Sequence, residues 1–272
     1  MMWAEALDYV QDMNQNKIFG FSDWRMPNRR ELRSLISHQS KNPSLPNGHP
    51  FINVFLGWYW TSTTAAINTA YAWYIHMEGA RVFYGNKKQS CLLWPVRGEG
   101  NKVLSATGQT QCYDADGGLI SCGGSGQDGT LRSGTAWPAR RFEVVGDTVI
   151  DHLTSLGWLQ SANLTREQVT WREAFSAVEQ LNRGSELAVN WRLPNINELE
   201  SLVDCSMHSP ALPAGHPFQE LQDEYWSSTT SMFEPEWAWA LYVNKGAVGV
   251  GHKKDALFSV WAVCDMLDIG AS

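Results

Sequence analysis

The chain has 272 residues, of which 43% are hydrophobic and 18% are charged, and its formal net charge is -7. That length suits two domains that each bury a core. Nucleic acids and anionic membranes attract basic surfaces, so the acidic balance argues against both as main partners. The sequence has no apolar run of about 18 residues, so we expect no membrane-spanning segment. The 14 Trp residues exceed ordinary usage and suit a binding surface.

Residues 1–16 have the pattern of an amphipathic helix. Apolar side chains recur at helical spacing at Trp3, Ala6, Leu7, Val10 and Met13. A signal peptide would need a basic start and an apolar core, and this stretch has neither. We therefore interpret it as part of a mature protein or of a chain cut short at its start.

One motif occurs twice, as DWRMPNRREL from Asp23 to Leu32 and as NWRLPNINEL from Asn190 to Leu199. In each copy a short strand leads into Pro, the next Asn caps a helix, and the Glu three residues later completes a capping box. The Arg of each copy is expected to pair with that Glu or with backbone carbonyls. The motif predicts two related domains. It gives structural roles to Trp24, Arg25, Glu31, Trp191, Arg192 and Glu198.

Aromatic and β-branched runs follow the motif in both copies and predict antiparallel strands. They lie at 59–64, 72–75 and 92–96 in the first copy, and at 225–230, 238–241 and 258–263 in the second. The second copy also has leading strands at 142–145, 148–151 and 156–159, for which the first copy shows no counterpart. The predicted class is α+β, with each domain built from two helices packed on small antiparallel sheets with long loops.

The stretch between the copies is rich in Gly, Ser, Thr and Asp, which predicts turns and a linker rather than core. We therefore divide the chain into three parts. A first domain at 1–100 lacks its leading strands, a linker occupies 101–140, and a complete second domain occupies 141–272.

Two of the five cysteines change together between the copies. When the copies are aligned, Cys205 matches His38 and Cys264 matches Arg97. Both positions are Cys in one copy and neither is in the other, as expected for a bridge gained or lost as a unit. This pattern predicts a Cys205–Cys264 disulfide.

The other three cysteines precede Cys205 in the chain. Cys112 and Cys122 flank a turn and are expected to bridge a hairpin, whereas Cys91 is expected to be a buried thiol. Two disulfides favour an oxidising compartment, so we expect the protein to be periplasmic, at the cell surface or extracellular.

Several short motifs occur in a fixed order along the chain: Thr107-Gly108-Gln109-Thr110, Gly126-Gln127-Asp128-Gly129, Arg141-Phe142, Leu156-Gly157-Trp158-Leu159, Trp191-Arg192-Leu193-Pro194-Asn195, Glu198-Leu199 and Tyr225-Trp226-Ser227-Ser228-Thr229-Thr230. Together they resemble the Lcl C-terminal-like domain family of exported bacterial domains, in about one and a half tandem copies. The resemblance implies tandem C-type-lectin-like domains and an envelope or extracellular location. It also implies adhesion or ligand display, including sulfated-glycan binding in the adhesin that names the family.

We predict a non-enzymatic binding module whose partner is another protein or a surface glycan. The acidic balance departs from what a sulfated-glycan binder needs. One alternative is a structural subunit that docks onto a larger assembly or oligomer. Others, implied by fold relatives, are a display scaffold diversified by retroelements and an enzyme of the formylglycine-generating type, which needs a reactive cysteine.

The ligand residues of such a module are expected in the loops between the late strands. In the first domain these loops carry Asn68, Thr69, Tyr71, Arg81, Tyr84, Asn86 and Lys87. In the second domain they carry Phe233, Glu234, Glu236, Trp237, His252 and Lys253. Packing beneath the loops is the alternative role for each aromatic side chain.

Motifs for catalysis or metal binding are weak. The pattern G-x-G-x-x-G at 124–129 lacks the flanking strand and helix of a dinucleotide site. Residues 114–117 resemble half of a calcium loop without its later Glu. The His residues show no zinc-ligand spacing. We therefore predict no catalytic residues, no metal and no cofactor.

The absent leading strands should leave the closing strand at 92–96 of the first domain with an open edge. Open edges recruit partner strands. We predict that this edge is covered by residues 101–140, by another protein chain, or by residues upstream of Met1. A peptide that supplies the absent strands is expected to raise the melting temperature of the first domain, because it binds only the folded state.

Overall fold

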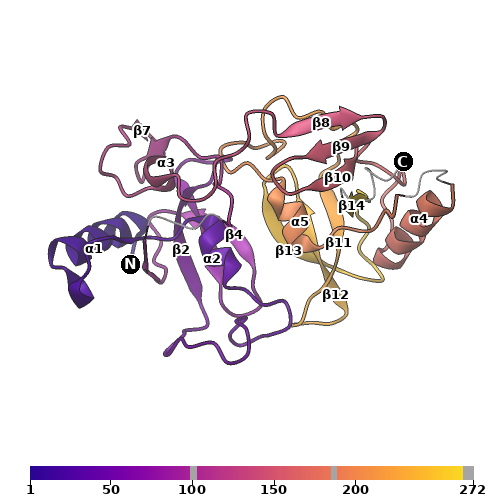
Figure 1. The fold of residues 1–272 in the computed structure, drawn as a ribbon. Helices are drawn as coiled ribbons and strands as arrows, with labels where there is room; N and C mark the ends of the chain where they lie inside the picture. Colours follow the sequence, from indigo (N-terminus) through magenta and orange to yellow (C-terminus); the bar gives the residue numbers. More distant parts are fainter. Residues whose placement is uncertain (99–102, 185–188, 266–272) are drawn as a thin grey trace. The chain divides into compact units, whose positions relative to one another are not determined.

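The computed structural model describes residues 1–98, 103–184 and 189–265, and it divides into two compact units (Figure 1). Unit 1 comprises Met1–Ala136 and Asp204–Ala211, and unit 2 comprises Trp137–Val203 and Leu212–Ser272. Both units combine helices with small antiparallel sheets. The predicted mixture of α and β structure is therefore confirmed.

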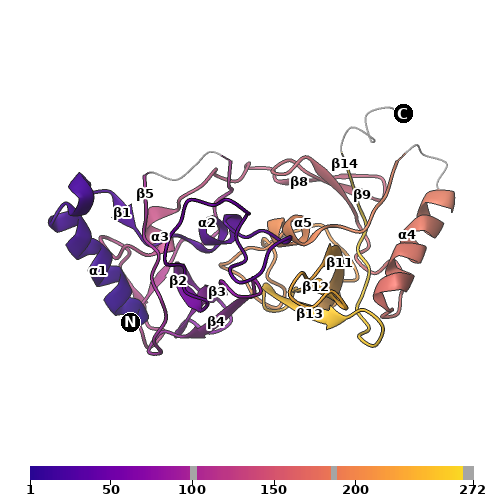
Figure 2. The ribbon, with the colours of Figure 1, turned by 90° about the horizontal axis from the view of Figure 1, so that it is seen from below.

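Unit 1 begins with helix α1 (Trp3–Gln15), the short 3-10 helix η1 (Ile18–Gly20), strand β1 (Trp24–Arg25) and helix α2 (Arg29–Ser34). Strands β2 (Trp58–Thr64), β3 (Tyr71–His76) and β4 (Val82–Asn86) form an antiparallel sheet, and β5 (Val96–Arg97) pairs with β1. Figure 2 shows α1 beside β1 and β2. The helical spacing of Trp3, Ala6 and Leu7 places all three in one apolar cluster with Trp60 of β2.

Residues 103–136 fold as part of unit 1 rather than as the linker that their composition predicts. They contain β6 (Cys112–Tyr113), β7 (Leu119–Ile120) and α3 (Asp128–Leu131). Strands β6 and β7 form the predicted hairpin, and the Cys112–Cys122 disulfide is confirmed. The linker prediction failed because the side chains that this segment buries are mostly polar, namely Thr107, Gln109, Gln127, Asp128 and Ser133.

Unit 2 contains all three predicted leading strands. Strands β8 (Phe142–Val145), β9 (Thr148–Asp151) and β10 (Leu156–Leu159) form an antiparallel sheet that β14 (Val263–Asp265) extends. Helix α4 (Trp171–Gly184) and helix α5 (Ile196–Ser201) follow β10. Strands β11 (Glu224–Thr230), β12 (Trp237–Tyr242) and β13 (Ala247–His252) form a second antiparallel sheet. The order of α4, α5 and β11 to β13 repeats that of α1, α2 and β2 to β4.

The repeated motif forms the same capping box in both units. In unit 1 the Glu31 N–H donates to Asn28 Oδ1 at 2.9 Å, and the Asn28 N–H donates to the Glu31 carboxylate at 2.9 Å. Asn195 and Glu198 repeat this exchange at 3.0 and 2.8 Å. Each Glu also binds the motif Arg, so the predicted structural pairing is confirmed for both copies.

The predicted closing strands are shorter than their apolar patterns indicate. Within the closing segment of unit 1 only Val96 and Arg97 form a strand, and the closing strand of unit 2 begins at Val263. Earlier residues of these segments form isolated bridges, such as that between Tyr59 and Leu92. Pro95 lacks an N–H and cannot continue a ladder in the first copy.

The predicted Cys205–Cys264 disulfide is wrong, because both side chains are buried thiols without a disulfide. Cys205 belongs to unit 1, where its N–H donates to the Thr107 carbonyl at 2.9 Å. Cys264 lies in β14 of unit 2, opposite Gly157. Two residues that change together between copies therefore serve separate local environments here.

Candidate binding site

The predicted ligand residues of unit 1 lie at two ends of the β3–β4 hairpin. At one end Tyr71 pairs with Asn86, and the rings of Tyr71 and Tyr84 are 6.2 Å apart between centroids. Asn68 lies in the adjoining loop, where its carbonyl accepts from the Tyr71 N–H at 2.9 Å. Arg81 precedes β4 at the opposite end. The structure therefore brings four of these residues together and leaves Arg81 apart.

The predicted ligand residues of unit 2 gather at one end of the β12–β13 hairpin. Trp237 pairs with His252, and their ring centroids are 5.4 Å apart. The His252 ring lies 3.6 Å from the Glu236 carboxylate, and the Trp237 N–H donates to the Glu234 carbonyl at 2.9 Å. Both glutamates are exposed, whereas Trp237 and His252 are half-buried.

Lys87 is fully buried, although the sequence placed it in a ligand loop. Its ammonium group donates to the carbonyls of Tyr113 at 3.2 Å and Asp114 at 3.1 Å. The same group lies 4.2 Å from the ring centroid of Trp3. Burial lowers the pKa of Lys87 to about 7. Residues 103–136 therefore cover this loop of unit 1.

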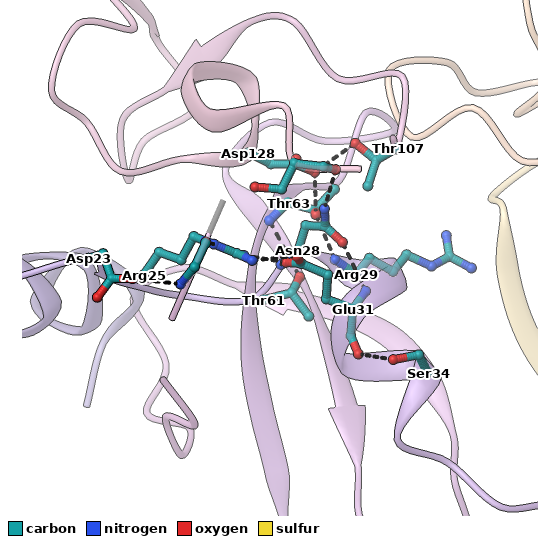
Figure 3. Close-up of polar contacts among 12 residues, drawn as sticks. Asp23, Arg25, Asn28, Arg29, Glu31, Ser34, Thr61, Thr63, Thr107 and Asp128 are labelled. Carbon is teal, nitrogen blue, oxygen red and sulfur yellow. Dashed lines mark hydrogen bonds and ion pairs between the residues drawn. The ribbon is translucent and has the colours of Figure 1, made fainter. Parts of the chain in front are cut away.

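We call residues 103–136 the covering segment. Asp128 joins this segment to the repeated motif (Figure 3). Its Oδ2 accepts from the hydroxyls of Thr63 at 2.6 Å and Thr107 at 2.7 Å. The Thr63 oxygen in turn accepts from the Arg29 N–H at the start of α2, at 3.0 Å. Asp128 is buried, and this burial raises its pKa to about 6. One carboxyl therefore connects β2, α2 and the segment.

Two further contacts complete the cover over unit 1. The Gln109 side chain accepts from the Thr64 N–H at 2.8 Å and donates to the Thr64 carbonyl at 2.9 Å. Gln11 of α1 donates to the Gly124 carbonyl at 2.9 Å. Residues 107–128 consequently shield the end of β2 and one side of α1.

The equivalent face of unit 2 is more exposed. Matching the motifs places Thr229 and Thr230 at the positions of Thr63 and Thr64, and both unit 2 residues are half-buried rather than buried. On the helices, Phe175 of α4 is 36% exposed at the position where Leu7 of α1 is 7% exposed.

Lys253 occupies the position of Lys87 but is only half-buried. It lies 4.2 Å from the ring centroid of Trp171 and donates to the Thr230 hydroxyl at 2.8 Å. Within the described residues, no counterpart of 103–136 buries this surface. We call it the open face, and it consists of Trp171, Phe175, Thr229, Thr230 and Lys253.

Sequence reasoning did not identify Thr63, Thr107 or Asp128 as partners. The signal available in the sequence was the pair of polar motifs at 107–110 and 126–129, in which Thr107, Gln109, Gln127 and Asp128 are buried. In the part of the chain that the structure describes, no group of three or more His, Cys, Asp or Glu side chains is placed to hold a metal ion. None of the described helices has the length and apolar character needed to cross a bilayer.

These features define the class of the protein. It has a duplicated framework of helices and antiparallel sheets, with a covering segment on unit 1 and an open face on unit 2. The sequence profile of the family described as the Lcl C-terminal domain matches residues 1–97 and 147–264, so the chain belongs to that family. Membership indicates a binding or structural module. No curated protein and no solved structure matched the chain. The covering segment lies outside the matched residues.

Proposed function

We propose that the protein is a non-enzymatic, exported binding module of two C-type-lectin-like domains, and that its open face binds a polypeptide segment. One observation carries the proposal: side chains buried beneath residues 107–128 in unit 1 have more exposed counterparts in unit 2. Family membership supports a binding role. The Cys112–Cys122 disulfide supports export, because disulfides persist in oxidising compartments.

Unit 1 indicates which ligand chemistry fits the open face. The Thr229 oxygen accepts from the Ile196 N–H at 3.1 Å, which leaves the Thr229 hydroxyl proton for a carboxylate like that of Asp128. Lys253 offers its ammonium protons to backbone carbonyls, as Lys87 does. Phe175 adds an apolar contact. A polypeptide with the chemistry of residues 107–128 meets all three requirements.

A non-enzymatic role agrees with the state of four of the five cysteines. Formylglycine-generating chemistry needs a reactive thiolate, the form that a raised pKa disfavours. Burial raises the pKa of both Cys91 and Cys205. Cys112 and Cys122 are held in the disulfide.

A neutral glycan is the second candidate ligand, at the neighbouring end of the β12–β13 hairpin. Trp237 is half-buried there, and Glu234 and Glu236 are exposed. A half-buried indole offers an apolar surface to a sugar ring, and carboxylates accept hydrogen bonds from sugar hydroxyls.

Titration of a disulfide-closed peptide of residues 104–133 into the intact chain tests the polypeptide proposal. We expect binding to wild type, measured by calorimetry. Phe175→Asp and Lys253→Met should each weaken it by about tenfold or more, since a lost contact of about 1.4 kcal/mol changes affinity that much. Tyr9→Asp, at an exposed position of α1, is the control and should bind like wild type.

Three results decide between the candidates. Lack of peptide binding to wild type, or equal binding by Phe175→Asp, would contradict the polypeptide proposal. Binding of neutral oligosaccharides that is lost in Trp237→Ala would favour the glycan instead.

A further inference from the structure

The closing segment of unit 2 has strand partners for which its unit 1 counterpart shows no equivalent among the described residues. In unit 2 the Leu159 N–H donates to the Ala262 carbonyl and the Leu164 N–H to the Val260 carbonyl, each at 3.1 Å. Strand β10 then pairs with β14. As a result, residues 260–264 are fully buried.

The closing segment of unit 1 is held on one side. The Trp60 N–H donates to the Leu92 carbonyl at 2.9 Å, and Val96 pairs with Arg25. Among the described residues, no strand pairs with the backbone of residues 93–95, and residues 92–96 are half-buried. Residues 103–136, which the sequence offered as one possible cover, make no backbone hydrogen bond to this segment within the described ranges.

An exposed apolar loop adjoins this edge. Phe51 packs edge-on against Trp94, with ring centroids 4.8 Å apart. In the same loop Ile52 is 84% exposed, Phe55 is 65% exposed, and Leu56 is also exposed. Contiguous apolar side chains on a surface mark an interaction site more often than scattered ones do.

Unit 2 shows how the same pair of rings is covered. Phe218 and Trp261 are the counterparts of Phe51 and Trp94, and their centroids are 4.7 Å apart. Phe142 of β8 packs on Phe218 at 5.1 Å, and Phe218 is buried. The backbone beside Phe218 is also paired, since the Ala162 N–H donates to the Gln219 carbonyl at 2.9 Å.

We propose that unit 1 binds strands of a different protein, rather than of a second copy of this chain, by β-addition along residues 92–97. The bound segment has the chemistry of residues 142–162: a strand that pairs with the closing segment, and an aromatic side chain that packs on Phe51. Unpaired strand edges bind strands through backbone hydrogen bonds, and neighbouring pockets select the side chains. The exposed side chains of Ile52 and Phe55 extend the apolar contact beyond that in unit 2, where Gln219 and Gln222 take their positions.

The test is a titration of a synthetic peptide of residues 140–162 into the intact chain, with hydrogen exchange to locate the bound peptide. We expect binding together with slower exchange of backbone amides within residues 92–97. The double variant Ile52→Asp/Phe55→Asp should weaken binding by about tenfold or more, and a peptide with Phe142→Ala should also bind less tightly. Both substituted positions of the protein are exposed, so the fold is expected to persist.

Phe175→Asp is the matched control, because it alters the open face of unit 2 and should leave this peptide's affinity unchanged. The two proposals can therefore fail separately. Absence of binding, or protection confined to β14 through exchange with the chain's own strands, would overturn the inference. Self-association of wild type that Ile52→Asp/Phe55→Asp abolishes would also overturn it, because the occupant would then be a second copy.

Discussion

At the scale of single residues, two ionisable groups of unit 1 are buried where the covering segment packs. Asp128 comes from the covering segment, and Lys87 directly follows β4. Burial disfavours the charged form of each side chain, which raises the pKa of Asp128 to about 6 and lowers the pKa of Lys87 to about 7. Stability should therefore depend on pH through both groups, over separate ranges and with opposite signs.

Asp128→Asn should remove one of these dependences. With a pKa of about 6 in the folded state and about 3.9 when unfolded, Asp128 binds more protons in the folded state between these values. Wild-type stability should therefore fall by roughly 2–3 kcal/mol as pH rises from about 4 to above about 6. In urea unfolding, the free energy of unfolding of Asp128→Asn should increase relative to that of wild type as pH rises over this range. Asp128→Ala removes the acceptor for both Thr hydroxyls and should be less stable than Asp128→Asn throughout. A difference between Asp128→Asn and wild type that does not vary with pH would contradict this account.

Lys87→Met should have the opposite dependence. The folded state lowers the pKa of Lys87 from 10.5 to about 7, so the unfolded state binds more protons between these values. Wild-type stability should then rise by roughly 2 kcal/mol between about pH 7 and about pH 9, and Lys87→Met should lack this rise. Lys253→Met is the control at the equivalent half-buried position and should change the pH dependence less. Equal effects of both variants would show that Lys87 is not covered as described.

Residues with local partners were predictable from the sequence. The capping Asn, its Glu and the paired Arg lie within one short motif, so their contacts follow from chain geometry. Asp128 was not predictable, because its partners Thr63 and Thr107 are far away in sequence. Lys87 was misplaced for a related reason: a lysine in a polar loop is normally exposed, and its burial depends on carbonyls of residues 113 and 114.

At the scale of elements, residues 103–136 remain ordered with little regular structure. Their hairpin has two residue pairs, and their only helix within the described residues is short. Composition therefore could not distinguish this segment from a linker. Its fixed position depends on the disulfide and on the polar contacts of Gln109 and Asp128.

Removal of the disulfide should loosen the segment. The Cys112–Cys122 bond closes a loop with a sequence separation of 10, and a loop of this size corresponds to about 2–3 kcal/mol of stabilisation. The double variant Cys112→Ser/Cys122→Ser should be cleaved faster within 114–121 under limited proteolysis. Cys91→Ser, which breaks no disulfide, is the control. An unchanged cleavage rate in the double variant would show that the polar contacts alone hold the segment.

At the scale of the whole molecule, each unit contains a part for which the other shows no counterpart among the described residues. Unit 1 has the covering segment, and unit 2 has strands β8 to β10. The duplication and the absent leading strands were predictable, because repeats and alternating apolar patterns are visible in one sequence. The open face was not, since it emerges only when the burial of equivalent residues is compared.

Hydrogen exchange at two equivalent amides tests the central claim most directly, namely that unit 2 has an open face that fits a covering segment. The Thr64 N–H donates to Gln109 and should exchange slowly, whereas the Thr230 N–H has no such side-chain partner among the described residues. We expect Thr230 to exchange at least about tenfold faster than Thr64 in the protein alone, and to slow when the peptide of residues 104–133 is added. Equal protection of Thr64 and Thr230 without peptide would contradict the claim.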